Sequence, residues 1–417
     1  MSSQAELKNE ALESSGAPLS SYRWVIAAGV VISNWSLVIP SLSFGILLPE
    51  IRTSFPMTDT QAGWLSSSAR IGNVLLAIAS VFIFARTNPL KLLRTTIFLG
   101  AGFTFMMAAA MNFWMMAVAR LAFGASFSAR TPSRPLLSQQ WFPLREIPVL
   151  NGIVIGLTSL AEFFALAATP FILAWVGNWR TTLSIYGAFV SAVFLAWMVL
   201  GKERITPDYL KKAAAPNKFG VRGVWRYKQL WFMGFGGFAA AFGWWAFATF
   251  WPTYMRDAHG IPLKESGVLF GLISLAQAPA SIVAGVIAMR VKDRRPILVA
   301  CGIGMTGSLI GMTLVTETWA LALLGIVGGV SWCYMPIMFS MPYEIPGIDL
   351  MSVSAGTALM TTILTTGAII GPIAAGSISD TTHSLFIALI VCGCVPILMA
   401  LFSLPVRPYR RPVQAST

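Results

Sequence analysis

Three ionisable side chains lie inside long apolar stretches of this sequence, where a charge is costly. Arg70, Arg120 and Glu162 each have many apolar residues on both sides. An arginine at the centre of a bilayer costs roughly 2.5–3.5 kcal/mol on insertion scales. A membrane protein that keeps such a charge usually turns it toward a partner, a cavity or a ligand. These three residues are therefore the first candidates for a functional site.

The chemistry available to them is anion binding and proton transfer. A guanidinium binds a carboxylate or another planar anion through two hydrogen bonds, which makes Arg70 and Arg120 candidate substrate-binding residues. A carboxyl group in a low dielectric favours its neutral form, so Glu162 is a candidate proton-coupling residue. Glu162 is equally a candidate for the permanent counter-ion of either arginine, and Arg120 for a purely structural tie between helices. Two arginines against one carboxylate leave one positive charge over, which favours an anionic substrate.

The composition identifies the chain as a polytopic membrane protein. Of its 417 residues, 56% are hydrophobic and 11% are charged, whereas a soluble globular chain has about 25% charged residues. About 20 mostly apolar residues are enough for a membrane-spanning helix. The sequence contains twelve apolar runs of this kind, at 24–48, 61–84, 92–111, 113–137, 147–174, 180–200, 230–254, 266–289, 296–315, 318–340, 351–378 and 384–404.

The distribution of positive charge predicts the orientation. Twelve spans place both termini on one side, and the tails and loops of that side hold 23 Lys and Arg residues, against 4 on the other. Basic residues gather in cytoplasmic loops, so both termini are expected in the cytoplasm of a multi-pass protein of the inner (plasma) membrane. The net charge of +13 is explained in this way, and we expect no nucleic-acid partner.

The two halves of the chain resemble each other. Four Gly or Pro residues recur at a nearly constant offset of 202 to 204 residues, in the pairs Pro49/Pro252, Gly63/Gly267, Gly124/Gly328 and Pro170/Pro372. A constant offset indicates six spans followed by six similar spans, related as parallel repeats. The expected organisation is a cytoplasmic tail at 1–22, a six-helix half at 23–200, a basic cytoplasmic linker at 201–228, a second six-helix half at 229–405 and a tail at 406–417.

The sequence predicts neither a metal nor a cofactor. The four cysteines lie in apolar runs and the two histidines lie next to loops, without a cluster of metal-ligand spacing. No His, Cys or Ser constellation of a catalytic type is visible, and no phosphate-binding loop is present. We therefore expect no catalytic residues, and a protein that is not an enzyme.

Several motifs carry a resemblance to a known family. Arg120 and Gly124 resemble the Arg-x-x-x-Gly element of the fourth helix of the major facilitator superfamily. The stretch Gly371-Pro372-Ile-Ala-Ala-Gly376 resembles its Gly-Pro-x-x-Gly-Gly element, here in the eleventh run. Twelve spans in two halves with a long basic central loop fit the same family, over about residues 23 to 405. The resemblance implies an all-α membrane protein of twelve transmembrane helices in two six-helix halves.

Two loops resemble further elements of the family. The stretch Arg290-Val-Lys-Asp293-Arg294-Arg295 is similar to its Asp-Arg-x-Gly-Arg gating element, without the glycine. The matching loop from Arg86 to Arg94 keeps basic residues and lacks the acidic one. Gating candidates are thus Asp293, Arg294, Arg86 and Arg94. The stretch Trp141-Phe142-Pro143 is similar to a pattern of the anion-handling branches, which include organic-anion symporters and nitrate or cyanate porters.

The resemblance also implies a substrate site near the middle of the membrane, reached alternately from each side as one half rocks against the other. Polar and aromatic residues at this depth complete the substrate-binding candidates: Asn34, Trp35, Trp244, Trp245, Gln277, Trp332, Tyr334 and Thr365. Asp380 and His383, at the end of the eleventh run, are expected to be solvated.

Taken together, the sequence predicts a secondary active transporter of a small anion, an organic acid or an inorganic anion, in symport with protons. The expected partners are this anion, protons and the lipid bilayer, and the expected state is a monomer. Two alternatives stay open at this point. An efflux transporter for drugs or metabolites is favoured weakly by the aromatic seventh run, and a non-transporting membrane sensor belongs to another class of function.

Overall fold

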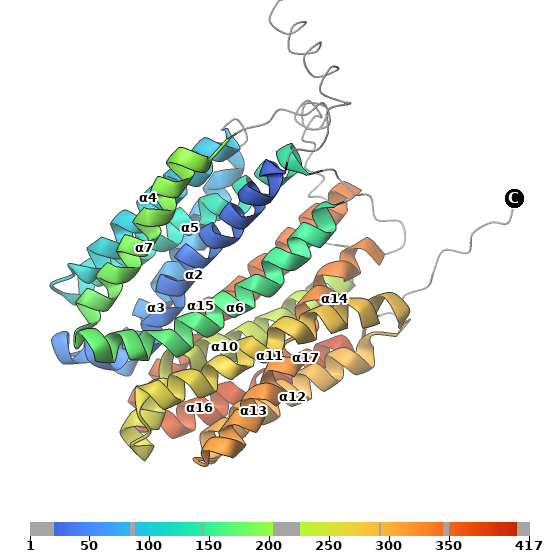
Figure 1. The fold of residues 1–417 in the computed structure, drawn as a ribbon. Helices are drawn as coiled ribbons and strands as arrows, with labels where there is room; N and C mark the ends of the chain where they lie inside the picture. The colour runs from blue at the N-terminus through green and yellow to red at the C-terminus, as the bar shows by residue number, and fades with distance from the viewer. Residues whose placement is uncertain are drawn as a thin grey trace, which may run out of the picture. The chain divides into compact units, whose positions relative to one another are not determined.

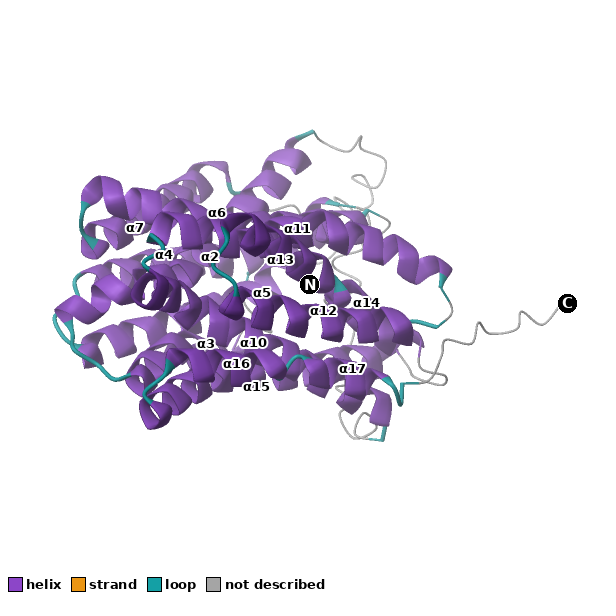
Figure 2. Cartoon of the chain, turned by 90° about the horizontal axis from the view of Figure 1, so that it is seen from below, coloured by secondary structure: helices purple, strands orange, loops and turns teal. Residues whose placement is uncertain are grey.

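The structure, a computed structural model, describes residues 21–83, 88–142, 146–202, 226–291, 293–344 and 350–406. The expected tails at 1–22 and 406–417 and the expected linker at 201–228 lie largely outside the described residues. Within the described ranges every regular element is a helix (Figure 2). The prediction of an all-α chain is therefore confirmed for this part of the protein.

The helices follow the predicted apolar runs closely and are labelled in Figure 1. In chain order they are α2 (Tyr22–Ser54), α3 (Asp59–Ile83), α4 (Pro89–Ala108), α5 (Phe113–Trp141), α6 (Ile147–Val176), α7 (Trp179–Leu200), α10 (Lys228–His259), α11 (Leu263–Arg290), α12 (Arg295–Leu314), α13 (Thr318–Ser331), α14 (Tyr334–Ser340), the short 3₁₀ helix η3 (Met341–Glu344), α15 (Leu350–Thr382), α16 (Leu385–Cys394) and α17 (Ile397–Ser403).

Most of these helices can cross a membrane. Ten helical segments in the described residues are long and apolar enough to do so, and α5 adds a shorter apolar stretch, Phe113–Ser128. The 25-residue helix α3 coincides with the second predicted run and contains Arg70. The tenth predicted run is divided between α13 and α14 by a break at Trp332 and Cys333, and the twelfth between α16 and α17 by a break before Ile397. The twelve predicted spans thus all have a helical counterpart.

Helix ends follow ordinary local chemistry. At the start of α4 the side chain of Asn88 accepts hydrogen bonds from the backbone N–H groups of Leu90 and Lys91, and Pro89 occupies the first helical position. At the end of α10, Gly260 adopts a φ of 67°, a left-handed conformation that suits glycine. Short connections of this kind allow consecutive helices to turn back on each other.

The described chain groups into two compact units, which cut across the two halves expected from the sequence. Unit 1 comprises residues 1–40, 71–158 and 183–218, and unit 2 comprises residues 41–70, 159–182 and 219–417. Helices α2, α3, α6 and α7 each contribute to both units. The division into halves at 23–200 and 229–405 stays a prediction.

In unit 2, α3 packs against α15 with their backbones in direct contact. A Cβ atom at Gly63 of α3 would overlap the carbonyl oxygen of Pro372, and one at Gly376 of α15 would overlap the carbonyl oxygen of Asp59. From the first contact to the second, the chain runs back four residues on α3, from Gly63 to Asp59, and forward four residues on α15, from Pro372 to Gly376. The two helices are therefore antiparallel. Only glycine leaves room for such an approach.

The same contact recurs between α6 and α11. A Cβ atom at Gly267 of α11 would lie 2.6 Å from the carbonyl oxygen of Leu166 and 2.8 Å from a ring carbon of Pro170, both on α6. Gly63 and Gly267 form one of the repeated pairs in the sequence, and Pro170 and Pro372 form another. The repeat therefore has a structural meaning, because the glycine of each predicted half packs against the proline region of the other.

This packing predicts that side chains are not tolerated at the contact. We expect Gly63→Ala and Gly376→Ala to lower the unfolding temperature of the purified protein in detergent, because displaced backbone in a packed interior costs roughly 1–3 kcal/mol. Matched controls are Gly102→Ala and Gly307→Ala, since a Cβ atom at either helical position meets nothing within 4 Å. Equal stability of all four variants would contradict the packing.

Candidate functional site

Arg70 is held on two sides by residues of unit 2. Its Nη1 donates a hydrogen bond to the hydroxyl of Ser41, at 3.2 Å. Its guanidinium carbon lies 3.6 Å from the centroid of the Trp245 ring, so the indole covers one face of the charged group. The side chain is half-buried and comes from α3, whereas Ser41 comes from α2 and Trp245 from α10. A stack of this kind lets a cation keep part of its electrostatic stabilisation away from water.

Glu162 belongs to the same cluster. It lies on α6, is half-buried, and is close enough to Arg70 for the two charges to interact. The hydroxyl of Ser274, on α11, lies near the Glu162 carboxylate without a well-formed hydrogen bond. In the described part of the chain, no direct ion pair joins Arg70 to Glu162. The two groups compensate each other's charge, and Arg70 has several N–H donors that bond to none of the described residues.

The packing of α3 on α10 explains why Arg70 meets Trp245. One turn before Arg70, the hydroxyl of Ser66 is hydrogen bonded to that of Thr249, at 2.7 Å. The Thr249 hydroxyl also donates to the carbonyl oxygen of Trp245, at 2.8 Å. The pairs Ser66/Thr249 and Arg70/Trp245 are thus contacts one helical turn apart. They run forward along α3 and backward along α10, so the two helices are antiparallel. This register fixes the height of Arg70 along α10.

Arg120 and Asn34 belong to unit 1, and their positions are described within that unit alone. Arg120, on α5, is buried, with 3% of its surface exposed. Asn34 is also buried, and its amide donates to the hydroxyl of Thr158 at 2.5 Å. Trp35, next along α2, is half-buried. The structure therefore brings Arg70 and Glu162 together and leaves their relation to Arg120 a prediction.

The aromatic candidates of the second half form a cluster of their own in unit 2. The ring of Trp244 stacks on Phe270 with centroids 5.1 Å apart, and it meets the edge of Trp332 at 5.2 Å. Trp332 in turn lies 5.9 Å from Tyr334, at the break between α13 and α14. All four rings are buried. Their contacts show a packing role, and substrate binding by Trp244, Trp332 or Tyr334 stays a prediction.

The remaining candidates are polar groups on α11 and α15. Gln277 lies three residues after Ser274 and is half-buried. Thr365 is also half-buried, and its hydroxyl donates to the carbonyl oxygen of Thr361 in the preceding turn. Neither side chain makes a described contact with Arg70 or Glu162.

The gating candidates have contacts of a structural kind. In unit 1, Arg94 donates from Nε to the carbonyl oxygen of Trp197 at 2.9 Å and from Nη2 to that of Gly201 at 3.0 Å, so it caps the C-terminal end of α7. In unit 2, Arg294 donates to the hydroxyl of Ser340 at 2.7 Å, and the exposed Asp293 accepts from the backbone N–H of Arg295. Arg86 lies outside the described residues.

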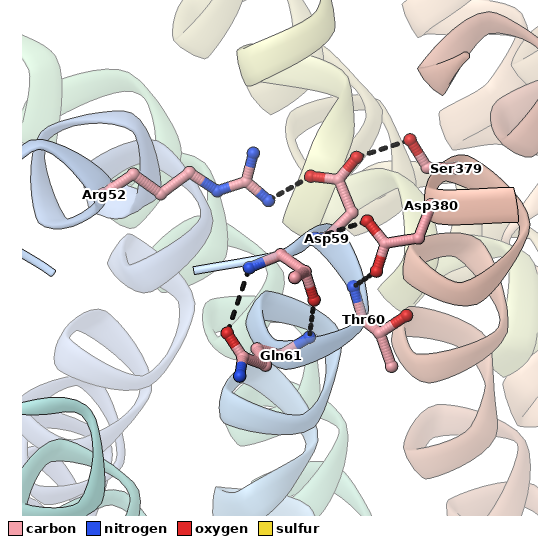
Figure 3. Close-up of polar contacts among 7 residues, drawn as sticks. Arg52, Asp59, Thr60, Gln61, Ser379 and Asp380 are labelled. Atoms are coloured by element: carbon pink, nitrogen blue, oxygen red, sulfur yellow. Dashed lines mark hydrogen bonds and ion pairs between the residues drawn. The ribbon is translucent and has the colours of Figure 1, made fainter. Parts of the chain in front are cut away.

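A polar cluster that the sequence did not predict joins α3 to α15 (Figure 3). Both carboxylate oxygens of Asp380 accept hydrogen bonds from the start of α3, from the N–H of Asp59 at 2.9 Å and of Thr60 at 2.8 Å. The Asp59 carboxylate accepts from Arg52 and from the Ser379 hydroxyl. We call these five residues the Asp380 cluster. The expectation that Asp380 is simply solvated is wrong, because it caps the positive end of a helix.

A hollow of about 780 Å³ lies beside this cluster. Its lining includes the carboxylates of Asp59, Asp257 and Asp380, and no Lys or Arg among the described residues. Such a surface repels anions. This hollow is therefore a poor candidate for binding an anion.

Two site residues were missed by sequence reasoning, Ser41 and Ser274. A serine in an apolar run gives little signal, because its hydroxyl can bond to the preceding turn of its own helix. Ser274 had one available signal, since it lies 204 residues after Arg70, which is the offset of the repeat. It is the neutral counterpart of Arg70 in the second half of the sequence.

The fold and the site define a class of protein, a polytopic helical protein with a charged cluster among its apolar helices. The chain belongs to the Major Facilitator Superfamily, whose family model matches residues 24–353. This membership confirms the predicted family, the twelve-helix fold class and a transport protein rather than an enzyme.

Individual relatives are distant in sequence and similar in length. The chain is 23% identical to a probable sulfoacetate transporter of Cupriavidus necator, over 93% of this chain and 94% of the relative. It is 24% identical to a probable L-galactonate transporter of Escherichia coli, over 83% of this chain and 80% of the relative. A solved structure of a bacterial homologue of the human lysosomal transporter Spinster matches with a TM-score of 0.76 at 14% identity, over 92% of this chain and 96% of that chain. This last likeness concerns the fold alone.

The Asp380 cluster leads to a prediction about stability. We expect Asp380→Asn to destabilise the protein by about 0.5–2 kcal/mol, because an amide has one acceptor oxygen and no charge to offer the helix N-terminus. The matched control is Asp257→Asn, whose carboxylate is exposed and bonded to the adjacent Arg256. Thermal unfolding in detergent measures both variants, and an equally stable Asp380→Asn protein would contradict the capping role.

Proposed function

We propose that this protein is a secondary active transporter of small organic-acid anions and that Arg70 binds the carboxylate of the substrate. The observation that carries the proposal is the state of the Arg70 side chain. Its charge lies among apolar helices, it is half-exposed, and within the described residues it uses one hydrogen bond, to Ser41. Its remaining N–H groups match the oxygens of a carboxylate bidentately.

The names of the relatives support an acid as the substrate. Besides the sulfoacetate and L-galactonate transporters, the chain is 23% identical to a hexuronate transporter of Bacillus subtilis over 86% of its length. Sulfoacetate, galactonate and hexuronate all carry a carboxylate group. A probable nitrate/nitrite antiporter of Thermus thermophilus matches over 61% of this chain, so a planar inorganic anion is the second choice.

The charge balance of the site favours coupling to protons. Arg70 and Glu162 together are neutral, and a bound monoanion would leave one uncompensated negative charge at low dielectric. Such a charge is costly. Protonation of Glu162 removes it, so the neutral unit that moves is one anion with one proton. Symport of this kind is electroneutral for a monocarboxylate.

The contacts between α3 and α15 and between α6 and α11 are the proposed barrier of the alternating-access cycle. The positive charge of the loops favours cytoplasmic termini, and on that orientation the Asp380 cluster lies at the outer ends of its helices. Entry of substrate from outside then requires α3 and α15 to separate. The hydrogen bonds of the Asp380 cluster and the glycine contacts would have to break in each cycle.

Transport assays test the role of Arg70. In proteoliposomes with an inwardly directed proton gradient, uptake of labelled L-galactonate, sulfoacetate and propionate is measured. We expect Arg70→Gln to reduce uptake of every transported acid by at least about a hundredfold and Arg70→Lys by about tenfold, because lysine lacks the bidentate fork. We expect Glu162→Gln to bind the acid and to lose the response to the gradient.

Arg180→Gln is the matched control for these variants. Arg180 also stacks on a tryptophan, with its guanidinium carbon 4.3 Å from the Trp179 ring, but it lies at the start of α7. We expect this variant to retain uptake. Full transport by Arg70→Gln, or equal losses in Arg70→Gln and Arg180→Gln, would overturn the proposal.

A reversible cross-link tests the barrier. The hydroxyls of Thr60 on α3 and Ser377 on α15 are 3.4 Å apart. In a variant without the four native cysteines, we expect Thr60→Cys with Ser377→Cys to form a disulfide on oxidation and to stop uptake until reductant is added. Each single cysteine variant is the control. Undiminished uptake by the cross-linked protein would show that α3 and α15 need not separate.

A further inference from the structure

Trp245 stands out among the tryptophans because of how closely it covers Arg70. The guanidinium carbon lies over the Trp245 ring at 3.6 Å from its centroid, which is a van der Waals contact. Seven other cation–aromatic contacts among the described residues range from 4.3 to 5.9 Å. Trp245 is also half-buried, whereas its neighbour Trp244 is buried.

We propose that Trp245 is a positioning residue that fixes the plane of the Arg70 guanidinium, so that the site takes planar carboxylates edge-on in preference to tetrahedral anions. This inference rests on the proposed role of Arg70 as the anion ligand. It assigns to Trp245 an action through Arg70 rather than a contact with the acid.

Two contacts together define the orientation of the guanidinium. The contact with the Trp245 ring limits the tilt of the guanidinium, and the hydrogen bond from Nη1 to Ser41 limits its rotation within its own plane. A free arginine side chain carries about 2 kcal/mol of rotamer entropy. A guanidinium that is already ordered loses less of this entropy when an anion binds, which raises the affinity.

The stack also keeps Arg70 apart from Glu162. In the described part of the chain the two charges interact without a direct ion pair, although their opposite signs favour one. Without the indole, the guanidinium is free to swing toward the carboxylate and form that pair. The substrate would then have to displace Glu162, and binding would depend more steeply on the protonation of Glu162 than it does in the proposed wild-type site.

Trp245 is itself firmly anchored on α10. Its carbonyl oxygen accepts from Thr249, which is bonded to Ser66 of α3. The neighbouring Trp244 packs against both Phe270 and Trp332. Earlier along α10, the carbonyl oxygen of Phe242 contacts Gly371 of α15 so closely that a Cβ atom there would overlap it. The backbone that carries the indole is therefore held in place on both sides, which is what positioning requires.

The selectivity follows from the shape of the anion. A carboxylate that binds edge-on lies with its carbon and both oxygens in the guanidinium plane. A sulfonate that places two oxygens in this plane directs its third oxygen to one side and its carbon chain to the other, so one of the two is crowded on the side of the indole. The face of an aromatic ring is negative and repels an oxygen placed against it. Edge-on binding beside Trp245 thus disfavours the tetrahedral head group.

The test uses purified full-length protein and two anions of matched size, sodium propionate and sodium ethanesulfonate. A ligand that binds the native state raises the unfolding temperature in a concentration-dependent way, which yields its dissociation constant. The variants are Trp245→Leu and Trp245→Phe, with Trp175→Leu as the control because Trp175 is 82% exposed on α6. Each is measured at one pH below and one above neutrality.

We expect Trp245→Leu to weaken propionate binding about tenfold, to reduce the preference for propionate over ethanesulfonate, and to make propionate binding depend more steeply on pH. Trp245→Phe should recover most of the affinity, because it keeps an aromatic face. In the uptake assay the KM for propionate should rise while the maximal rate stays within about twofold.

Unchanged affinity, selectivity and pH dependence in Trp245→Leu would overturn the inference, as would the same changes in Trp175→Leu. A lower maximal rate with an unchanged KM would also overturn it, because that pattern indicates a role in the conformational cycle. Arg70→Gln separates this outcome from a failure of the proposed function. If Arg70→Gln loses propionate binding and Trp245→Leu does not, the positioning role alone fails. If wild-type protein responds to neither anion, or Arg70→Gln responds fully, the proposed anion site fails as well.

Discussion

The arrangement of unit 2 depends on one constraint, the direct backbone contact between helices that are distant in sequence. Gly63 admits the carbonyl oxygen of Pro372, and Gly267 admits α6 at Leu166 and Pro170. In a bilayer, helices gain little from the hydrophobic effect when they associate, and small residues that allow close approach supply much of the packing energy. These two contacts fix how α3 and α6 lie against α15 and α11. The positions of Arg70 and Glu162, on α3 and α6, follow from them.

The sequence repeat relates the glycines and prolines of the two halves, but it does not relate the charged residues. Arg70 lies seven residues after Gly63, and Ser274 lies seven residues after Gly267, so the two occupy equivalent places in the repeat. Glu162 lies eight residues before Pro170, and the residue eight before Pro372 is Leu364. The first half thus carries both charges and the second half carries neutral residues at the matching places. In the proposed site one arginine binds one anion and a protonated Glu162 leaves the complex neutral, whereas a duplicated pair would bury two further charges at low dielectric.

The sequence predicted the elements well and the contacts poorly, for physical reasons. Span length and charge bias act locally along the chain, so the twelve runs and the family resemblance could be recognised from composition and motifs. Arg70 and Glu162 were recognisable because a charge in an apolar run is costly unless a partner, a cavity or a ligand compensates it. The stack on Trp245, by contrast, depends on the register of α3 against α10, which is set by contacts between residues 183 apart such as Ser66 and Thr249. The bond from Asp59 to Asp380 spans 321 residues and left no local signal.

Helix α3 links the two polar features of unit 2. Its first residue, Asp59, is bound by Asp380, and Arg70 follows eleven residues later. At a rise of about 1.5 Å per residue the two points are roughly 16 Å apart along one continuous helix. If the part of α3 from Asp59 to Arg70 moves as one piece in the proposed cycle, release of its N-terminal end from α15 would also displace Arg70 relative to Trp245 and Glu162. A substrate bound at Arg70 would in turn restrain the start of α3. The proposed cycle therefore couples the Asp380 cluster to the Arg70 site through the helix that carries both.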